Sequence, residues 1–422
     1  MTITEALSFI HGVSWLGSKP GLSRICELLS RLGNPQKTLR FVHIAGTNGK
    51  GSTAAMTASV LSAAGLTTAL YTSPYIQKFN ERMQINGTPI PDAELAAVTE
   101  TVAVHARAMD DSPTEFELVT AIALTWFAQK HCDIVVLEVG MGGRLDATNA
   151  IDAPDCAVIT NIGLDHTQYL GETPEQIALE KAGIIKPGCD VVLYQQSDAV
   201  MQAVQSVCDT LHTPLHSSDR AQLELLEHTM NGQRFRYRGS IYRIPLLGAH
   251  QLENAAVVLE LLAVLRAKGW QILQEAIEAG LAATVWPARF EIVHRDPIVV
   301  VDGGHNPQCA ETVAANLKQY FPTSRRILLI GILADKDFSG MTDILASAAD
   351  AFVTITPDSP RALPANELAE HLQRYGKPVT ACNSIDAGIA SALQLAGTDG
   401  MVCSVGSLYT AGHVRNYFGL DA

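Results

Sequence analysis

A glycine-rich segment with one lysine stands between an apolar run and a helix-like stretch. The apolar run is 41–45, and the segment reads Gly46-Thr-Asn-Gly-Lys50-Gly-Ser52. Backbone N–H groups at such a turn, together with the start of the following helix, attract phosphate oxygens. The glycines let the backbone come close, and the lysine supplies positive charge for the terminal phosphates. The segment predicts a nucleotide site, although its spacing departs from the usual phosphate-loop pattern; the alternative is an ordinary strand-to-helix turn with an exposed lysine.

An acidic residue stands near the end of a second apolar run. This run is 134–139, it contains Glu138, and a glycine-rich stretch at 140–143 follows it. Nucleoside triphosphatases hold Mg²⁺, directly or through water, with a carboxylate at the end of a buried strand beside the phosphate loop. On its own a glutamate in this place is commonly just solvated. Combined with the phosphate loop, the pattern favours Glu138 as a magnesium ligand.

Two further side chains could join such a metal site. His166 comes shortly after the apolar run 157–161, so it is expected at the same sheet edge as Glu138. An imidazole is an unusual Mg²⁺ ligand because Mg²⁺ prefers oxygen, so a plain surface or core histidine stays open. Lys181 lies in the amphipathic stretch 179–184 and could simply face water.

A third group of polar residues follows the apolar run 298–301. It reads Asp302-Gly-Gly-His305-Asn-Pro307. At a strand-to-helix junction Asp302 and His305 would lie at a sheet edge, available to a ligand between two domains. As residues of an ordinary loop they would carry no chemistry.

These residues need a scaffold, and the hydrophobic pattern predicts one of alternating strands and helices. Most of the strand-like runs are continuously apolar, which is typical of strands that helices cover on both faces. Alternation of strands and helices favours parallel sheets in an α/β fold. The expected strands are 41–45, 68–72, 134–139, 157–161, 191–194, 298–301, 327–330, 352–355 and 401–405, and the expected helices include 53–64, 117–130, 254–267 and 385–395.

One segment and one joint stand out from this alternation. Residues 234–244 alternate polar and apolar side chains around Gly239-Ser240, which predicts an exposed β-hairpin with a solvated face of arginines. The joint between two domains is expected within 286–297, because Pro287 and Pro297 bracket it and a new strand follows at once.

Length and composition narrow the class of protein. The chain has 422 residues, 47% of them hydrophobic, which predicts two or three globular domains. Thirty Lys and Arg against 43 Asp and Glu give a net charge of −13, which argues against a nucleic-acid partner. A signal peptide is not expected, because residues 1–10 carry Glu5 and no basic or extended apolar stretch, and no apolar run reaches the length of a membrane span. Its 8 cysteines form no CxxC pair, so we expect reduced thiols in a cytoplasmic protein.

Taken together, the ordered segments resemble the folylpolyglutamate synthase and dihydrofolate synthase family of Mur-ligase-like amide ligases. Besides the phosphate loop, the segments that carry the resemblance are 71–74, 79–82, 138–149, 165–167, 180–183, 288–290, 302–307, 336–337 and 406–407. The resemblance implies an α/β fold of two domains. Residues 1–294 would form an ATP-binding, Mur-ligase-like central domain with a P-loop-type, mostly parallel sheet and a folate site. Residues 295–422 would form a smaller Rossmann-like glutamate ligase domain.

The resemblance also implies a set of ligands and roles. ATP would be bound by Thr47, Asn48, Gly49, Lys50, Gly51 and Ser52, and would also contact Asn254, Arg289 and Asp302. Two Mg²⁺ ions would be held by Ser73, Glu138, His166 and a carbamylated Lys181. Carbamylation is physically sensible, because CO₂ turns an ammonium that repels Mg²⁺ into an oxygen ligand that suits it. Lys50, Lys181 and His305 are the residues expected to act in catalysis.

The implied reaction joins L-glutamate to a folate or to dihydropteroate, with ATP converted to ADP. The implied pterin-binding positions are Lys19, Pro20, Gly21, Leu22, Thr114, Glu115, Phe116, Glu117, Leu145, Asp146 and Ala147. Transfer of the γ-phosphoryl group to a carboxylate would give an acyl phosphate, which the glutamate amine attacks. The motifs that bind ATP and Mg²⁺ are common to the reactions with both acceptors, so the choice between folate and dihydropteroate stays open.

Two other functions are weighed against this one. A nucleotide-regulated binding protein or GTPase switch would bind nucleotide without forming an amide. A cell-wall Mur ligase would carry an extra domain before the phosphate loop, and the 45 residues before Gly46 are too few for one. No segment marks a dimer interface, so a monomer is expected.

Overall fold

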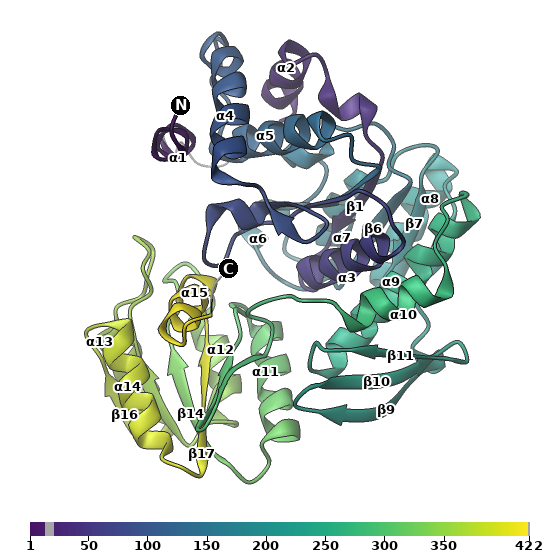
Figure 1. The fold of residues 1–422 in the computed structure, drawn as a ribbon. Helices are drawn as coiled ribbons and strands as arrows, with labels where there is room; N and C mark the ends of the chain where they lie inside the picture. The colour runs from purple at the N-terminus through teal and green to yellow at the C-terminus, as the bar shows by residue number, and fades with distance from the viewer. Residues whose placement is uncertain (13–20, 421–422) are drawn as a thin grey trace.

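The structure, a computed structural model, describes residues 1–12 and 21–420. Lys19 and Pro20, two of the expected pterin-binding residues, lie outside the described residues. Figure 1 shows two α/β bodies and, beside them, a small antiparallel sheet. None of the helices in the described part of the chain is long and apolar enough to span a membrane.

The first body is built on an eight-stranded sheet with the order β4-β3-β2-β5-β1-β6-β7-β8. The pairs from β2 to β8 are parallel, and β3 and β4 form an antiparallel edge. The strands are β1 (Phe41–Ala45), β2 (Thr68–Tyr71), β3 (Met83–Ile85), β4 (Thr88–Pro89), β5 (Ile134–Glu138), β6 (Cys156–Ile159), β7 (Asp190–Leu193) and β8 (Leu215–Ser217). The five strands expected in this part of the chain are all present, so the α/β prediction is confirmed.

Helices cover both faces of this sheet, which explains why its strands are apolar without alternation. On one face lie α3 (Lys50–Ala63), α9 (Ala249–Ala267) and α10 (Gln274–Ala282). On the other face lie α1 (Ile3–His11), α2 (Ser23–Arg31), α4 (Asp92–Arg107), α5 (Glu115–Gln129), α7 (Pro174–Lys181) and α8 (Asp198–Leu211). Neighbouring residues of β1 point to opposite faces, Val42 toward α9 and Phe41 toward α5.

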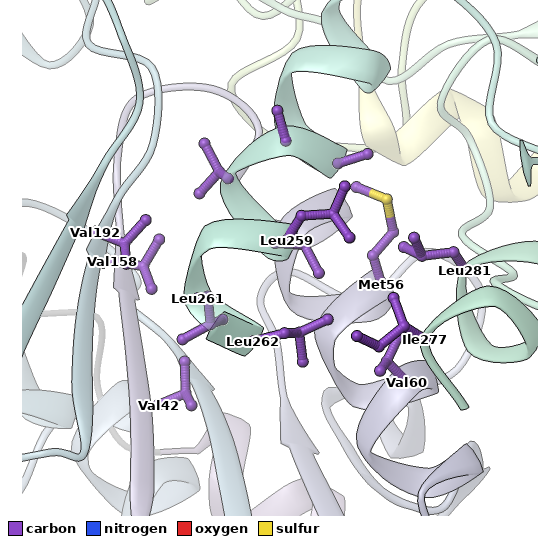
Figure 2. Close-up of a cluster of buried hydrophobic side chains, with 14 of the residues drawn as sticks. Val42, Met56, Val60, Val158, Val192, Leu259, Leu261, Leu262, Ile277 and Leu281 are labelled. Atoms are coloured by element: carbon purple, nitrogen blue, oxygen red, sulfur yellow. The ribbon is translucent and has the colours of Figure 1, made fainter. Parts of the chain in front are cut away.

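The core under α9 joins the sheet to two more helices. Figure 2 shows Leu259, Leu261 and Leu262 of α9 among Val42, Val158 and Val192 of the sheet and Met56, Val60, Ile277 and Leu281 of α3 and α10. The helices cross closely because α10 has a glycine at the contact. A Cβ on Gly280 would lie 2.4 Å from the Cα of Val60. This packing fixes α3 against the sheet, and the phosphate loop leads directly into that helix.

The predicted hairpin is present and has a third strand. β10 (Gly232–Tyr237) and β11 (Ser240–Ile244) pair with Tyr237 opposite Ser240, so the turn residues are Arg238 and Gly239. Both have positive φ, 45° and 83°, as a tight hairpin turn requires. β9 (Leu223–Thr229) pairs with the other edge of β10. Arg238 is bound by Glu260, which agrees with an ion-paired, solvated face.

The second body has a six-stranded sheet with the order β12-β13-β17-β14-β15-β16. Its strands are β12 (Glu291–Arg295), β13 (Ile298–Val301), β14 (Arg325–Ile330), β15 (Ala351–Thr354), β16 (Val379–Ala381) and β17 (Gly400–Val405). One face packs on α11 (Pro307–Tyr320), α12 (Phe338–Ala346) and α13 (Ala365–Leu372), and the other on α14 (Ile385–Ala396) and α15 (Leu408–Tyr417). The four strands expected here are confirmed.

The division of the chain after residue 294 stays a prediction. β12 begins at Glu291 and is hydrogen-bonded to β13, so the second sheet takes up the chain within the expected joint at 286–297.

Shortening a side chain in the core under α9 tests this packing. Leu262→Ala should lower the free energy of unfolding by ~2–5 kcal/mol, because the fully buried side chain leaves a cavity. Leu273→Ala is the matched control: its side chain is 68% exposed, and its effect should stay within about 0.5 kcal/mol. Urea unfolding followed by circular dichroism measures both variants. Equal unfolding midpoints for the two would contradict the assigned core.

Candidate active site

The polar residues singled out in the sequence meet at the carboxyl ends of the parallel strands. A cavity of about 480 Å³ lies there between the two bodies. Its lining includes all of the expected nucleotide, metal and catalytic residues, namely Thr47, Asn48, Gly49, Lys50, Gly51, Ser52, Ser73, Glu138, His166, Lys181, Asn254, Arg289, Asp302 and His305. Segments far apart in the chain, such as those of Asn48 and Asn306, therefore share one site.

The phosphate loop runs from the end of β1 into α3. The first bond within the helix joins the Thr53 N–H to the Gly49 carbonyl, at 2.9 Å. The N–H groups of residues 50–52 consequently have no partner inside the helix and point out of its start, where an anion is favoured. The preceding amides are used differently: those of Thr47 and Asn48 donate to the Asn161 carbonyl of the β6 edge, at 2.8 and 3.3 Å.

Gly49 leads the chain into α3 with a φ of +86°. A Cβ here would lie 2.5 Å from the Asn254 side-chain oxygen, so the missing side chain lets α9 come up against the loop. Asn254 is 3% exposed, and its amide donates to Gln251, which in turn donates to the Ser52 hydroxyl, at 3.1 and 3.2 Å. The α9 residues thus hold the loop in place.

Two lysines point at the same carbonyl of the phosphate loop. Nζ of Lys50 lies 3.0 Å from the Gly46 carbonyl oxygen, and Nζ of Lys181 lies 2.8 Å from it. Lys181 is 4% exposed, so the alternative of a lysine facing water is wrong. Burial, together with the neighbouring Lys50, lowers the pKa of Lys181 to about 7.

The acidic group of the site is Glu138, at the end of β5. It is 5% exposed and accepts a hydrogen bond from the Ser73 N–H at 3.2 Å. Burial raises its pKa, while Lys50 and Arg289 oppose that shift. A buried carboxylate beside a phosphate loop suits a cation, because a cation offsets the cost of keeping it charged.

The backbone around Ser73 is held by both bodies. Glu81 accepts the N–H groups of Ile76, Gln77 and Lys78, at 2.8, 2.9 and 2.6 Å. The Gln77 amide donates to Asn416 of α15 at 2.6 Å. The loop that carries Ser73 is consequently docked on the second body, where α15 lies next to the first in Figure 1.

His166 lies just before the short helix α6 (Thr167–Leu170), and its φ is +51°. Its side chain is 42% exposed, with Nε2 3.9 Å from Asp165. Within residues 1–12 and 21–420, no three His, Cys, Asp or Glu side chains are grouped closely enough to hold a metal ion. A metal in this cavity would therefore need other ligand types, such as the Ser73 hydroxyl or a modified Lys181, beside Glu138 and His166.

The second body contributes Arg289, Asp302 and His305. Asp302 is buried and accepts the N–H groups of Phe290 and Gly304, at 2.9 and 2.7 Å, which fixes the end of β13. Burial raises the pKa of Asp302 and lowers that of His305 to about 4, so the imidazole is neutral at neutral pH. Its Nδ1 lies 3.1 Å from the Gly303 carbonyl.

A polar network joins the two bodies over the cavity. Lys336 binds Asp165 at 3.0 Å, and Asn306 donates to both Asp165 and Asn48, at 3.3 and 3.1 Å. Burial disfavours the charge on Asp165, but Lys336 and His166 hold its pKa at about 2, so the ion pair persists at neutral pH.

The expected pterin-binding residues within the described chain lie outside the cavity lining. Thr114 caps α5 in a capping box with Glu117, whose carboxylate also binds Arg24 at 3.0 Å. Asp146 caps the short helix η3 (Ala147–Asn149), and its pKa is raised by burial. Leu22 precedes α2, next to Gly21, and Glu115 opens α5. Phe116 packs against Gly140, and Leu145 is 48% exposed.

Several residues of the cavity escaped the sequence analysis. They are Tyr194, Arg220, His250, Gln251, Glu253 and Gln308. The spacing of Gln251 and Asn254, three residues apart at the start of a helix, is the one feature that could have drawn attention to Gln251. Gln308 directly follows the segment 302–307, and Tyr194 ends the expected strand 191–194, whereas Arg220, His250 and Glu253 stand in segments without a motif.

Comparison with known proteins shows what this arrangement is similar to. The Mur ligase middle domain matches residues 44–262, and the Mur ligase glutamate ligase domain matches residues 288–408. A dihydrofolate synthase/folylpolyglutamate synthase of Bacillus subtilis is 38% identical over 429 residues, covering 97% of this chain and 98% of the relative.

Solved structures agree over the whole chain. The structure of E. coli FolC in complex with DHPP and ADP has a TM-score of 0.88 at 32% identity, covering 99% of this chain and 98% of that one. The structures of Mycobacterium tuberculosis folylpolyglutamate synthase complexed with ADP and AMPPCP give a TM-score of 0.91 at 33% identity, covering 99% of each chain.

The close approach of α9 to the phosphate loop can be tested at Gly49. Gly49→Ala should weaken ADP binding about tenfold or more, roughly 1.4 kcal/mol, because the added Cβ displaces Asn254. Gly65→Ala is the matched control, since Gly65 has the same φ of +86° but a Cβ there meets nothing within 4 Å. Isothermal titration calorimetry measures both. Unchanged affinity in Gly49→Ala would show that the loop does not bind the nucleotide in this conformation.

Proposed function

The chain belongs to the folylpolyglutamate synthase and dihydrofolate synthase family of Mur ligases, and from that premise we propose how its site works. It is an ATP-dependent ligase that joins L-glutamate to a folate carboxylate. The observation that carries this assignment is the shared cavity, in which a phosphate loop with Lys50 faces the buried carboxylate of Glu138.

The chemistry explains why such a site is needed. A carboxylate is a poor acyl donor, since it is anionic and lacks a good leaving group. Transfer of the γ-phosphoryl group of ATP to a carboxylate oxygen gives an acyl phosphate and ADP. The glutamate α-amine then attacks the acyl carbon, phosphate leaves, and an amide remains. The protein's part in the first step is positioning and charge neutralisation.

Lys50 and the start of α3 bind the phosphates. The N–H groups of residues 50–52 point out of the helix, and the ammonium of Lys50 lies beside the same loop. Positive charge fixed here before the reaction stabilises the charge that spreads over the migrating phosphoryl group. Arg289 and Asp302 reach the nucleotide from the second body in this proposal.

Mg²⁺ fits the donor set of the cavity. Ser73, Glu138, His166 and a carbamylated Lys181 would hold it, and when bound it neutralises phosphate charge and orients the oxygens. The support from the chain is the buried, incompletely balanced carboxylate of Glu138 and the burial of Lys181. An unmodified ammonium in that position would repel the metal, whereas a carbamate supplies the oxygen that Mg²⁺ prefers.

Closure of the two bodies protects the intermediate. An acyl phosphate hydrolyses readily, so water must be kept out while the amine attacks. The contacts of Asn306 with Asn48 and of Lys336 with Asp165 bring the second body over the loop. His305, a neutral imidazole in the cavity wall, would contact the substrates there.

The acceptor is a folate, with dihydropteroate as a second substrate. The Bacillus subtilis relative carries both activities in its name, and the E. coli structure contains DHPP. The pterin would be bound by residues at the start of α5, by 145–147 and by 19–22. Purified protein assayed with dihydropteroate and with a reduced folate, side by side, decides between one activity and two. A monomer working in the cytoplasm is also proposed, and all 8 cysteines are free in the structure.

The phosphate-binding role of Lys50 is tested by its removal. Lys50→Ala should abolish ATP-dependent ligation, a loss of about 10³-fold or more in rate, as for other groups that stabilise transition-state charge. The fold should be intact by circular dichroism, because the hydrogen bonds of the Lys50 ammonium go to the Gly46 and Thr47 carbonyls of its own loop. Incorporation of labelled glutamate measures the effect. Turnover at the wild-type rate would refute the assignment.

Carbamylation of Lys181 is tested by chemical rescue. Lys181→Ala should lose activity and regain part of it when short carboxylic acids are added, because they can supply the missing oxygen ligand. In the wild-type protein, ¹³C NMR with labelled bicarbonate should show a carbamate signal that is absent from the variant. Full activity of Lys181→Ala without added acid would remove the carbamate from the mechanism.

A further inference from the structure

Asn48 lies in the middle of the phosphate loop, but each of its polar groups is bound to protein. Its N–H donates to the Asn161 carbonyl at 3.3 Å. Its carbonyl accepts from the Thr160 hydroxyl at 2.8 Å. Both backbone groups are thus tied to β6 and the residues after it, beside β1.

The side chain of Asn48 is bound to the other body. Its oxygen accepts from Nδ2 of Asn306 at 3.1 Å and from the thiol of Cys309 at 3.2 Å. Its amide donates to Oε1 of Gln308 at 2.6 Å. These three partners all stand at the beginning of α11, where Asn306 is the cap residue. One short side chain therefore makes three contacts across the cavity.

Neighbouring hydrogen bonds reinforce this contact between Asn48 and the start of α11. Asn306 is 4% exposed, and its amide donates both to Asn48 and to Asp165. Asp165 is in turn paired with Lys336. The side-chain amide of Gln308 also fits closely to the backbone, since a Cβ on Gly163 would lie 2.5 Å from its oxygen. A partly buried network of this kind favours one geometry, because a broken bond leaves the buried amide of Asn306 without one of its partners.

From this we propose that Asn48 is a positioning residue that closes the second body over the phosphate loop, and that it is not a ligand of the nucleotide. The proposal rests on the ligase function above. The N–H groups of residues 50–52 and Lys50 bind the phosphates, while Asn48 keeps α11 in place. Nucleotide binding and closure of the cavity are then carried by different residues of one loop.

When the contact between Asn48 and α11 is broken, we expect the acyl phosphate to be hydrolysed before the amine attacks it. In a loose cavity, water attacks the acyl phosphate, its oxygen bonds to the acyl carbon, and the bond from that carbon to the phosphate oxygen breaks. The products are the original carboxylate and inorganic phosphate, so the net reaction is hydrolysis of ATP to ADP. More than one ADP is then released for each amide formed.

The test compares Asn48→Ala, Gln308→Met and the double variant. We expect the rate of amide formation to fall about 10- to 100-fold, as for a small misplacement of reacting groups, and the ratio of ADP to amide to rise above one. Calorimetric affinity for ADP should stay within about threefold of the wild type, because the phosphate-binding groups are retained. The double variant should form amide no more slowly than the slower single variant, since both changes break the same contact between Asn48 and α11.

Gln319→Met is the matched control for the helix. Gln319 is an exposed residue of α11, and its replacement should leave rate, product ratio and ADP affinity unchanged. The thermal unfolding midpoint of each variant separates a loss of closure from a loss of fold. Gln308→Met lies outside the phosphate loop, so it tests the contact between Asn48 and α11 even if Asn48→Ala is poorly folded.

Small-angle X-ray scattering of the ADP-bound proteins gives a readout that does not depend on turnover. Asn48→Ala and Gln308→Met should show a larger radius of gyration than the wild type. A loss of ADP affinity beyond tenfold in Asn48→Ala with a product ratio of one would make Asn48 a nucleotide ligand and overturn the proposal, as would unchanged scattering in both variants. A wild-type protein that forms no amide would instead refute the ligase function, and the scattering would still decide the role of Asn48.

Discussion

The site depends on charges that balance one another only in part, two of which, on Lys181 and Glu138, are buried. Lys50 and Lys181 both donate to the Gly46 carbonyl, and Glu138 is held by a backbone N–H. Burial lowers the pKa of Lys181 and raises that of Glu138, so each group is driven toward its neutral form. A ligand that brings both signs, such as a triphosphate with a divalent cation, relieves both costs at once. The cavity is therefore suited to the metal complex of a nucleotide better than to either part alone.

The fold explains how such charges come to be neighbours. In a parallel sheet with helices on both faces, every strand ends at the same edge, and β1, β5 and β6 lie side by side there. The phosphate loop follows β1, Glu138 ends β5, and His166 follows β6. The second sheet brings Asp302 to the same cavity from β13. Contacts such as Asn48 with α11 make the loop part of the interface between the two bodies, so binding and closure share one short segment.

The sequence predicted well what local patterns determine. The expected strands 41–45 and 298–301 match β1 and β13 to the residue, because both are short, mostly apolar runs with a glycine one or two residues after them. The phosphate loop, Glu138 and Lys181 were found because each stands at a strand end or in a recognisable segment. Elements without such patterns were missed, among them the two-residue strand β4. The partners of Asn48, 258 to 261 residues away, follow from tertiary packing and leave no mark in the local sequence.

The central claim is that Lys50 and Glu138 act on one metal–triphosphate complex. A crystal structure of the protein with Mg²⁺ and an unhydrolysable ATP analogue tests it most directly. The account predicts the terminal phosphates at the N–H groups of residues 50–52 within hydrogen-bond distance of Nζ of Lys50, and the Glu138 carboxylate on the Mg²⁺ that those phosphates bind. A triphosphate bound elsewhere in the cavity, or a Mg²⁺ that leaves Glu138 without contact, would contradict it.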